Sequence, residues 1–405
     1  MAHFNSPTLE PGFIKPAPLR ILTRLRDLGT RIQNLTAALL RWYQGQVLMA
    51  HLPVGDGVDN VLQPLLAPAV HSLHLLIDDW RSFNAMNGFK AQEPRFLPLF
   101  QAYLGQDSET GLLDGYDNIV LFMPKAKEQA RFLIAQLLPL LKAGANFWLV
   151  GENNSGIKSA DKLVQLVAEA VLPAGSFQLS KADKAKKSVL LNLHLSAEAN
   201  VAASPSFDAT PWQVEWPLPK DDERLEILNE LKLLSLPGVF SHGRLDEGTA
   251  LMLKNLPRIK ASKIRQRRVL DMGCGTGVIG MSLLKRSPEI AVSFCDVSAM
   301  ALESTRRSLA HNHMTGEVIA SDMWQGIEER FDLIISNPPF HTGQSTDYDL
   351  AERFIRQAKK HLKRSGELRI VANRFLKYPD IIEATFGHCE RIAETGRFCV
   401  WSAKI

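Results

Sequence analysis

The feature that most constrains this chain is a glycine-rich turn that is followed, further along, by a proline-rich tetrapeptide. Residues 268–270 predict a short strand that runs into Asp271-Met-Gly-Cys-Gly-Thr-Gly277, after which a helix is expected from Val278. Because Gly273, Gly275 and Gly277 carry no Cβ, backbone N–H groups and a helix N-terminus can approach a ligand closely there. Such a turn alone is shared by many nucleotide binders. Its pairing with Asn337-Pro-Pro-Phe340, which follows the apolar run 333–336, is far more specific.

Length and composition indicate a soluble protein with two domains of ordinary size. The chain has 405 residues, of which 45% are hydrophobic and 22% charged. Neither an apolar run of the roughly 18 residues that span a bilayer nor a signal peptide is evident. The four cysteines lack C-x-x-C spacing, which argues against a disulfide framework and a zinc site. We therefore expect a cytoplasmic protein without a membrane segment or a bound metal, and the net charge of +4 permits an anionic partner.

Short apolar runs alternate with amphipathic segments in both halves, which predicts an α/β fold with mostly parallel sheets. Amphipathic helices are predicted over residues 19–42 and 224–236. Between the halves, residues 196–222 are rich in Ala, Ser and Pro and interrupt the alternation. We expect an N-terminal domain over 1–200, a linker over 201–222 and a second domain over 223–405.

The two halves can be aligned as an internal repeat. Tyr116-Asp117-x-Ile119 matches Phe331-Asp332-x-Ile334, and further residues match at a constant offset, among them Lys142 with Lys363 and Val150 with Val371. In this alignment the ligand-binding positions differ: Met49, His51 and Pro53 align with Asp271, Gly273 and Gly275, and Phe122 aligns with Asn337. Chance similarity between two α/β domains is the simpler explanation. In either case we expect the N-terminal half to be degenerate and to bind no cofactor.

Three aspartates each follow a predicted strand of the C-terminal half. Asp271 stands beside the glycine turn, where it can hold an ammonium group, and Asp296 is placed to accept from ribose hydroxyls. Asp322 can accept from an adenine amino group. Each aspartate taken singly can be a helix or turn cap. Together they describe a nucleoside that carries an amino acid and a positive charge, and we predict S-adenosylmethionine (SAM) as the cofactor.

Asn337-Pro-Pro-Phe340 supplies acceptor chemistry. An exocyclic amine is a poor nucleophile because its lone pair is delocalised into the ring. The side-chain oxygen of Asn337 and the carbonyl of Pro338 can accept its two hydrogens, and Phe340 offers a face on which an unstacked base can lie. Catalysis then depends on positioning and hydrogen bonding and requires no strong base. The alternative is that this segment is only a rigid turn.

Two further features have weaker support. Asp246 and Thr249 are predicted to cap a helix whose N-terminus faces the methionine end of the cofactor; a plain capped helix explains them equally well. Basic residues also cluster twice and can follow a phosphate backbone, although charge runs are more often solvated faces. The first cluster is Arg258, Lys260, Lys263, Arg265, Arg267 and Arg268, and the second is Lys359, Lys360, Lys363 and Arg364.

These motifs resemble those of the RsmC family, the bacterial 16S ribosomal RNA guanine-N2 methyltransferases. The similarity lies in Pro237-Gly-Val-Phe-Ser241, Leu245-Asp246, the 269–278 turn, Cys295-Asp-Val-Ser298 and Ile334–His341, and it extends through 366–373, 378–380 and Thr395-Gly-Arg-Phe398. In the N-terminal half the similarity includes Val150-Gly-Glu-Asn153. The chain departs from the family pattern in residues 1–45, which are longer, and its first domain matches only in patches.

The resemblance implies two tandem Rossmann-like class I methyltransferase domains, of which the N-terminal one is degenerate and assists RNA binding. It implies that a SAM-dependent enzyme, expected to be a monomer, methylates a guanine of 16S rRNA in the assembled small ribosomal subunit. It assigns cofactor contacts to Gly273, Gly275, Asp296 and Asp322, and substrate contacts to Asn337, Pro338 and Phe340.

Other functions stay open. The enzyme acting on large-subunit rRNA shares the Asn-Pro-Pro-Phe-His core, although the Thr-Gly-Arg-Phe ending favours the small-subunit enzyme. Enzymes with related motifs methylate adenine N6 in nucleic acid or a glutamine amide in protein. A degenerate first domain is unusual for a glutamine methyltransferase. An assembly factor that uses SAM structurally, or not at all, is the alternative from another class. It would be indicated by damage to the Asp, Gly and Asn set, and these residues are intact.

Overall fold

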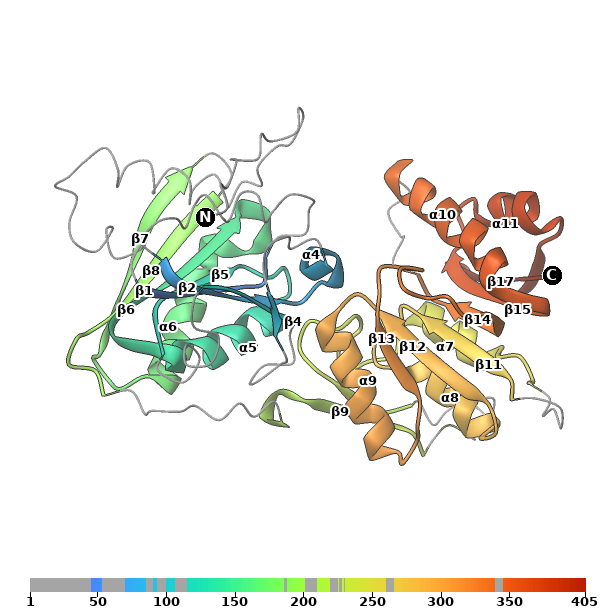
Figure 1. Cartoon of the computed structure of the whole chain (residues 1–405), viewed down its shortest axis with the longest axis horizontal. Helices are drawn as coiled ribbons and strands as arrows, with labels where there is room; N and C mark the ends of the chain where they lie inside the picture. Colours follow the sequence, from blue (N-terminus) through green and yellow to red (C-terminus); the bar gives the residue numbers. More distant parts are fainter. Residues whose placement is uncertain are drawn as a thin grey trace. The chain divides into compact units, whose positions relative to one another are not determined.

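The chain forms two compact units, residues 1–208 and 209–405 (Figure 1). The computed structural model describes residues 45–52, 70–84, 90–92, 100–105, 115–185, 188–200, 210–218, 225, 228, 230–259, 266–338 and 345–405. The helix predicted over 19–42 therefore lies outside the described residues. Within the described part, every helix is too short or too polar to cross a membrane.

Unit 1 is built on one mixed sheet with the strand order β3-β4-β2-β1-β5-β6-β8-β7. Its strands β2, β1, β5 and β6 are parallel, whereas β4, β3, β8 and β7 are added in antiparallel pairs. The strands are β1 (Gly45–Ala50), β2 (Val70–Ile77), β3 (Lys90–Gln92), β4 (Phe100–Gly105), β5 (Tyr116–Phe122), β6 (Leu141–Glu152), β7 (Phe177–Ala185) and β8 (Ser188–Leu195). The helices are α4 (Trp80–Asn84), α5 (Lys127–Leu137) and α6 (Ala160–Val171), with 3₁₀ turns η2 (Leu138–Leu140), η3 (Asn153–Ser155) and η4 (Ile157–Ser159).

Unit 2 contains a second mixed sheet with the order β13-β12-β11-β14-β15-β17-β16. Its antiparallel pairings are those of β17 with β15 and with β16, so the closing pair is antiparallel as predicted. The strands are β11 (Arg268–Met272), β12 (Ala291–Asp296), β13 (Glu317–Ala320), β14 (Phe331–Ser336), β15 (Leu362–Asn373), β16 (Glu390–Glu394) and β17 (Phe398–Lys404). The helices are α7 (Glu247–Lys254), α8 (Val278–Arg286), α9 (Ala299–His311), α10 (Ser345–His361) and α11 (Tyr378–Phe386).

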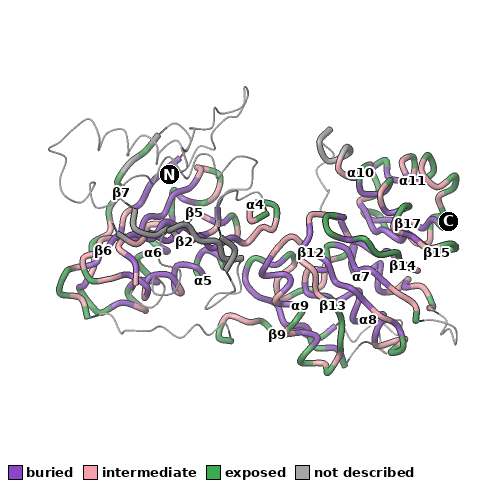
Figure 2. The backbone as a smooth tube through the Cα atoms, viewed as in Figure 1, coloured by how far each residue is buried: buried purple, intermediate pink, exposed green. Residues whose placement is uncertain are grey.

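The central strands of unit 2 are buried on both faces (Figure 2). One apolar cluster joins residues of α7, α8 and β10 (Lys232–Ser235) to one face of the sheet, and the other joins α10 and α11 to the opposite face. Near-continuous apolar runs such as Leu333-Ile-Ile are typical of strands covered by helices on both sides. Because the parallel strands run the same way, the segments that follow β11, β12, β13 and β14 all emerge at one edge of the sheet.

The pairing of strands supports the internal repeat independently of the sequence match. Val47 of β1 pairs with Asn118 of β5, and Val269 of β11 pairs with Leu333 of β14, which are the aligned positions. An ion pair recurs at the start of these strands as well. Asp117 accepts from the backbone N–H of Gln46 at 2.8 Å and from Lys142 Nζ at 3.3 Å.

In unit 2 Asp332 accepts from the backbone N–H of Arg268 at 2.9 Å and from Lys363 Nζ at 3.1 Å. Chance similarity of two α/β domains does not explain a carboxylate that bonds the same two partners at aligned positions. The units do differ at one sheet edge. There β4 is antiparallel to β2, whereas β13 is parallel to β12.

One sequence prediction near the unit boundary is wrong. Within residues 224–236, where a helix was predicted, Lys232–Ser235 forms strand β10, which pairs with β9 (Val214–Pro217). The cause is tertiary: backbone N–H groups of Leu234 and Leu236 donate to hydroxyls of Ser308 and Ser304 on α9. Part of the segment predicted as a linker, with η5 (Thr210–Trp212) and β9, accordingly belongs to unit 2.

Candidate functional site

The glycine turn joins β11 to α8 at the carboxyl edge of the sheet. Gly273, Gly275 and Gly277 have φ values of 71°, 58° and 79°, a region that only glycine adopts without strain. A Cβ built on Gly273 or Gly275 meets no atom within 4 Å, whereas one on Gly277 meets Thr305 at 3.0 Å. The first two glycines therefore border open space that a ligand can fill, and the third is required by packing.

Asp271 is a buried carboxyl near the end of β11, just before the turn. It is 1% exposed, and its Oδ2 accepts from the backbone N–H of Gly280 at 2.8 Å, which satisfies one N–H of the first turn of α8. Its Oδ1 is buried without a hydrogen-bond partner among the described residues. Burial raises the pKa of this carboxyl to about 7; the Gly280 hydrogen bond opposes the rise and nearby Asp296 adds to it. A cationic group would both pair with Oδ1 and favour the ionised form.

Asp296 ends β12 and supports the glycine turn directly. Its Oδ2 accepts from the N–H of Gly275 at 3.0 Å and its Oδ1 from the N–H of Ser298 at 2.9 Å. Asp322 lies one strand further out, in the turn after β13, where its backbone carbonyl accepts from Gln325 at 3.2 Å. The structure thus brings all three predicted aspartates to the ends of adjacent strands β11, β12 and β13.

Asn337 follows β14 and is held by α7. Its Nδ2 donates to Thr249 Oγ1 at 2.9 Å and to Asp246 Oδ2 at 3.2 Å. Its Oδ1 is buried without a hydrogen-bond partner among the described residues. An unpaired buried acceptor costs about 1–3 kcal/mol, so this oxygen is suited to a donor that arrives with a ligand. Pro338 is buried beside it, and Phe340 lies outside the described residues.

Asp246 caps α7 as predicted. Its carboxylate accepts from the N–H groups of Gly248 at 2.9 Å and Thr249 at 3.1 Å. Thr249 is buried on the first turn, and its hydroxyl is used to hold Asn337. The sequence-based role for this pair was a helix N-terminus directed at the cofactor. The contacts that the structure gives them point instead to the acceptor motif, and a cofactor contact stays a prediction.

Two hydroxyl residues that the sequence reasoning missed also position the site. Thr305 on α9 donates to the carbonyl of Gly275 at 3.0 Å, and Ser336 donates to the carbonyl of Met272 at 2.7 Å. Both tie the glycine turn to neighbouring elements. Neither residue lies in a motif. The sequence marks them only as small polar residues at otherwise apolar positions of a helix and a strand.

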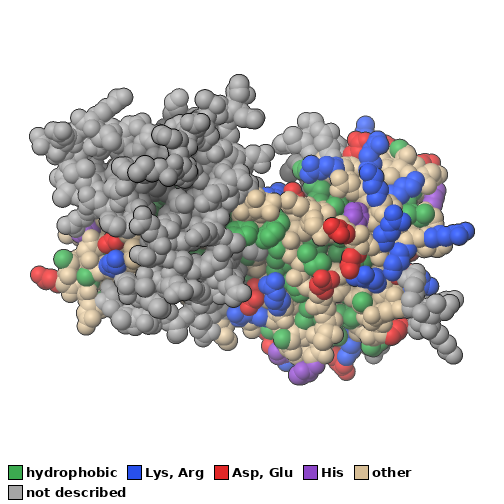
Figure 3. Space-filling view, in the orientation of Figure 1, with side chains coloured by type: hydrophobic (Ala, Val, Ile, Leu, Met, Phe, Trp, Pro, Cys, Tyr) green, Lys and Arg blue, Asp and Glu red, His purple; other side chains and the backbone are tan. Residues whose placement is uncertain are grey.

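The predicted basic clusters are partly used within the fold. Arg267 bonds Asp332 at 2.8 Å, Arg268 pairs with Glu329, and Lys359 donates to the carbonyl of Thr385 at 2.6 Å. Lys260, Lys263 and Arg265 lie outside the described residues. Lys and Arg side chains nevertheless gather over α10 (Figure 3).

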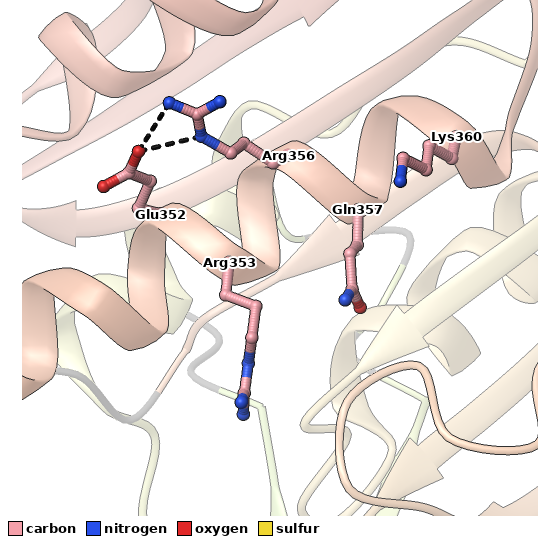
Figure 4. Close-up of a pocket in the computed structure, with 5 residues that line it drawn as sticks. All are labelled: Glu352, Arg353, Arg356, Gln357 and Lys360. Carbon is pink, nitrogen blue, oxygen red and sulfur yellow. Dashed lines mark hydrogen bonds and ion pairs between the residues drawn. The ribbon is translucent and has the colours of Figure 1, made fainter.

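An open hollow of about 390 Å³ on this helix is lined by Glu352, Arg353, Arg356, Gln357 and Lys360. Within it Glu352 pairs with Arg356, and Arg353 points away from that pair (Figure 4). Among the described residues, no group of three or more His, Cys, Asp or Glu side chains is arranged to hold a metal, and all four cysteines are free thiols.

The corresponding edge of unit 1 carries other side chains at the positions of the predicted ligand-binding residues. The N–H of His51 donates to the carbonyl of Leu76 at 2.9 Å, as Gly273 donates to Cys295 at 2.8 Å. His51 also keeps a left-handed backbone, with φ 55°. Its imidazole stands where Gly273 leaves space, and burial lowers its pKa although Asp78 and Asp79 raise it. Buried Met49, Ile77 and Phe122 stand at the positions of Asp271, Asp296 and Asn337.

Comparisons with known proteins agree with this geometry. Residues 230–402 match the "Methyltransferase small domain" model, and residues 43–211 match the "Methyltransferase small domain N-terminal" model. The chain is 40% identical over 303 residues to ribosomal RNA small subunit methyltransferase C of Cronobacter sakazakii, covering 75% of this chain and 80% of that protein. It is 38% identical over 344 residues to the protein of the same name from Aeromonas hydrophila, covering 84% and 89%.

A solved structure shares the fold across both units. It is the T. thermophilus 16S rRNA N2 G1207 methyltransferase in complex with AdoMet and guanosine. The TM-score is 0.67 at 22% identity, and the match covers 94% of this chain and 91% of that chain. The predicted fold class, α/β with two tandem methyltransferase domains, is confirmed. That the first domain is degenerate stays a prediction.

Proposed function

The chain belongs to the family of ribosomal RNA small subunit methyltransferase C, and on this premise we propose that it methylates the exocyclic N2 amine of a guanine in 16S rRNA, with SAM as methyl donor. The observation that carries the proposal is the Asn337 amide. Its nitrogen is fixed by Thr249 and Asp246, and its oxygen is buried and unpaired at the edge where the glycine turn ends.

The residues around the glycine turn fit SAM. The open space at Gly273 and Gly275 allows a ligand to approach the backbone, and the unpaired Oδ1 of Asp271 is suited to an ammonium group. Asp296 and Asp322 end the next two strands, where we assign them to the ribose hydroxyls and the adenine amine. When bound, SAM supplies an electrophilic methyl group. Residues of this chain bind SAM, orient the acceptor amine and accept its hydrogen bonds.

Asn337 and Pro338 are assigned to the acceptor amine. Asn337 Oδ1 and the Pro338 carbonyl each accept one hydrogen of the guanine N2 group, which localises its lone pair and directs it away from the two acceptors. Because the Asn337 amide is already oriented, little reorganisation is needed when the base arrives. The extra proton of the methylated amine is lost to solvent, so no strong base is needed. Phe340 is assigned to the face of the flipped base.

The setting of the reaction is also part of the proposal. We propose that the enzyme is a cytoplasmic monomer that acts on the assembled small subunit, with unit 1 binding RNA and not SAM. The proposed domains are residues 1–200 and 223–405, and the proposed linker is 201–222, within which β9 pairs with β10 of unit 2.

The proposal is tested by labelling. Purified protein, radiolabelled SAM and unmethylated small ribosomal subunits should yield labelled N2-methylguanosine after digestion of the 16S rRNA. Large subunits and a release-factor protein serve as competing substrates in parallel reactions. Label in 23S rRNA, in adenine or in a glutamine side chain would overturn the assignment in favour of the corresponding alternative. An absence of transfer to every substrate would favour an assembly factor.

A further inference from the structure

A fixed turn presents an aromatic side chain to solvent at the end of β15. Among the large hydrophobic side chains that the structure describes, Phe375 is the most exposed, at 65%. The N–H of Leu376 donates to the carbonyl of Asn373 at 3.0 Å, and the N–H of Arg374 donates to the carbonyl of Arg397 at 2.8 Å. Leu376 is buried in the core directly after Phe375. The exposure of the ring is therefore imposed by a well-anchored backbone.

The turn lies at the same sheet edge as the acceptor motif. β14 and β15 are parallel neighbours, and Ser336 pairs with Ile370. Asn337 follows Ser336 directly, while β15 continues to Asn373, about 10 Å further at roughly 3.3 Å per residue. Phe375 thus follows the strand that neighbours β14, and its turn lies further out at the edge where Asn337 follows β14. Figure 1 shows β14 and β15 side by side.

Basic residues flank Phe375 in the chain and in the segment to which its turn is bonded. Arg374 and Lys377 are exposed on either side of Phe375 in the chain. Arg397, which accepts the backbone bond of the turn, is 74% exposed and pairs with Glu247 at 3.2 Å. An exposed ion pair of this kind contributes little to stability, and another anion can replace its carboxylate. The nearest acidic residue in the following helix is Asp380. Three exposed cations near an exposed aromatic residue suit a nucleotide, whose base stacks and whose phosphate is anionic.

We propose that Phe375 is the stacking platform for an unpaired base that neighbours the methylated guanine, and that Arg374, Lys377 and Arg397 bind the phosphates beside that base. The inference rests on the proposed function and extends it, because it names a second RNA contact on the substrate path. A stacked neighbour holds the RNA strand open next to the extruded guanine. The site therefore contributes to binding of the subunit and does not take part in methyl transfer.

The test compares Phe375→Ala with Phe375→Tyr in methylation of small subunits. Stacking of a base on an aromatic side chain corresponds to roughly a fivefold or larger change in affinity. We expect Phe375→Ala to raise KM for small subunits at least fivefold with kcat and SAM affinity unchanged, and Phe375→Tyr to retain the KM of the unaltered protein. Ile405→Ala is the matched control, because Ile405 is 47% exposed and bonds Gly366 at the opposite end of β15.

A crosslinking experiment separates RNA from protein as the partner. Phe375 is replaced by photoreactive benzoylphenylalanine, and the variant is irradiated with small subunits. A crosslink to 16S rRNA supports the platform, whereas a crosslink only to a ribosomal protein overturns it. An unchanged KM for Phe375→Ala also overturns it, provided that the unaltered protein methylates the subunit. If the unaltered protein does not, the proposed function fails first, so the two failures are distinguishable.

Discussion

The side-chain nitrogen of Asn337 donates to the hydroxyl of Thr249 at 2.9 Å, which joins the end of β14 to the first turn of α7. The same nitrogen faces Asp246 Oδ2 at 3.2 Å, and an ionised carboxylate can only accept. The amide must therefore turn its nitrogen to α7 and its oxygen to the site. Two residues outside the motif decide which end of Asn337 meets the substrate.

Loss of this orientation should lower turnover. Asn337→Ala should reduce kcat by about 100-fold, the usual scale for removing one preorganised hydrogen-bonding group. Thr249→Val keeps the shape of the side chain and removes the hydroxyl, so we expect a smaller fall in kcat, about tenfold. Both variants should bind SAM within about twofold of the unaltered protein by calorimetry. A weakened SAM affinity with normal kcat in Thr249→Val would show that Thr249 serves the cofactor instead.

SAM affinity should depend on pH through Asp271. Burial raises the pKa of this carboxyl to about 7, and only the ionised form pairs with an ammonium group. Affinity should therefore rise between about pH 6 and pH 8, with proton release on binding below neutrality. Calorimetry in buffers of different ionisation enthalpy measures both quantities. Asp271→Asn should bind weakly at every pH, and an unchanged pH profile in that variant would assign the dependence to another group.

The same carboxyl should make the ligand-free protein less stable as pH rises. Because its folded pKa lies above the ordinary 3.8, the folded state binds the proton more tightly than the unfolded state does. The contribution to the free energy of unfolding therefore decreases as pH rises toward about 7 and levels off above it. Thermal unfolding with and without SAM across this range should show the largest stabilisation by SAM at the alkaline end. Asp271→Asn should remove this part of the pH dependence.

Alanine at the open glycines should affect ligand binding more than folding. Gly273 and Gly275 have positive φ, so a Cβ at either costs about 1–2 kcal/mol of stability. It would also occupy the space assigned to SAM. Gly387, the C-cap of α11 with φ 88°, likewise has no atom within 4 Å of a built Cβ. Gly387→Ala should match the stability loss and leave SAM affinity intact, and equal affinity losses in all three variants would point to a general folding defect.

The repeated ion pair should contribute more to the stability of unit 2 than to that of unit 1. The Asp332 side chain is 10% exposed and is bonded by Arg267, Lys363 and the N–H of Arg268, whereas that of Asp117 is 39% exposed. Asp332→Ala should lower the free energy of amide hydrogen exchange in β11 and β14 by about 2–3 kcal/mol. Asp117→Ala should lower the same quantity in β1 and β5 by less than about 1 kcal/mol. Hydrogen exchange measures each unit separately, which a single melting curve cannot do. Equal losses would contradict the exposure argument.

Binding stoichiometry tests the loss of the first site. Calorimetry should give one SAM per chain. Asp296→Asn should weaken that binding, because its carboxylate is assigned to the ribose and also supports the glycine turn. A stoichiometry of two SAM per chain would show that unit 1 has a working site.

The elements around the glycine turn could be predicted because local signals agree there. Val269-Leu270 and Leu333-Ile-Ile form buried strands that end at the predicted motifs. The helix predicted over 224–236 is wrong because only Leu225, Leu228 and Leu231 have helical spacing. The residues that follow them bond to α9. That docking depends on residues more than 60 positions away, such as Ser304 and Ser308.

The candidate site was likewise predictable in its residues and less so in its contacts. Asp271, Asp296 and Asn337 are identified by their place after strands. The bond between Asn337 and Asp246 joins residues that are 91 positions apart. No local pattern predicts it, because it exists only once α7 packs against the sheet. The αL backbone of His51 was equally hidden, since histidine gives no sign of a glycine-like turn.

The left-handed backbone at His51 shows what the strands at this edge impose by themselves. A non-glycine residue with φ 55° is held at a cost of about 1–2 kcal/mol. Gly273 has φ 71° at the aligned position of unit 2, so both units keep the turn although a ligand is assigned to only one of them. The path of the backbone is therefore set by the fold, and the size of the side chain at this one position decides how closely a ligand can approach it.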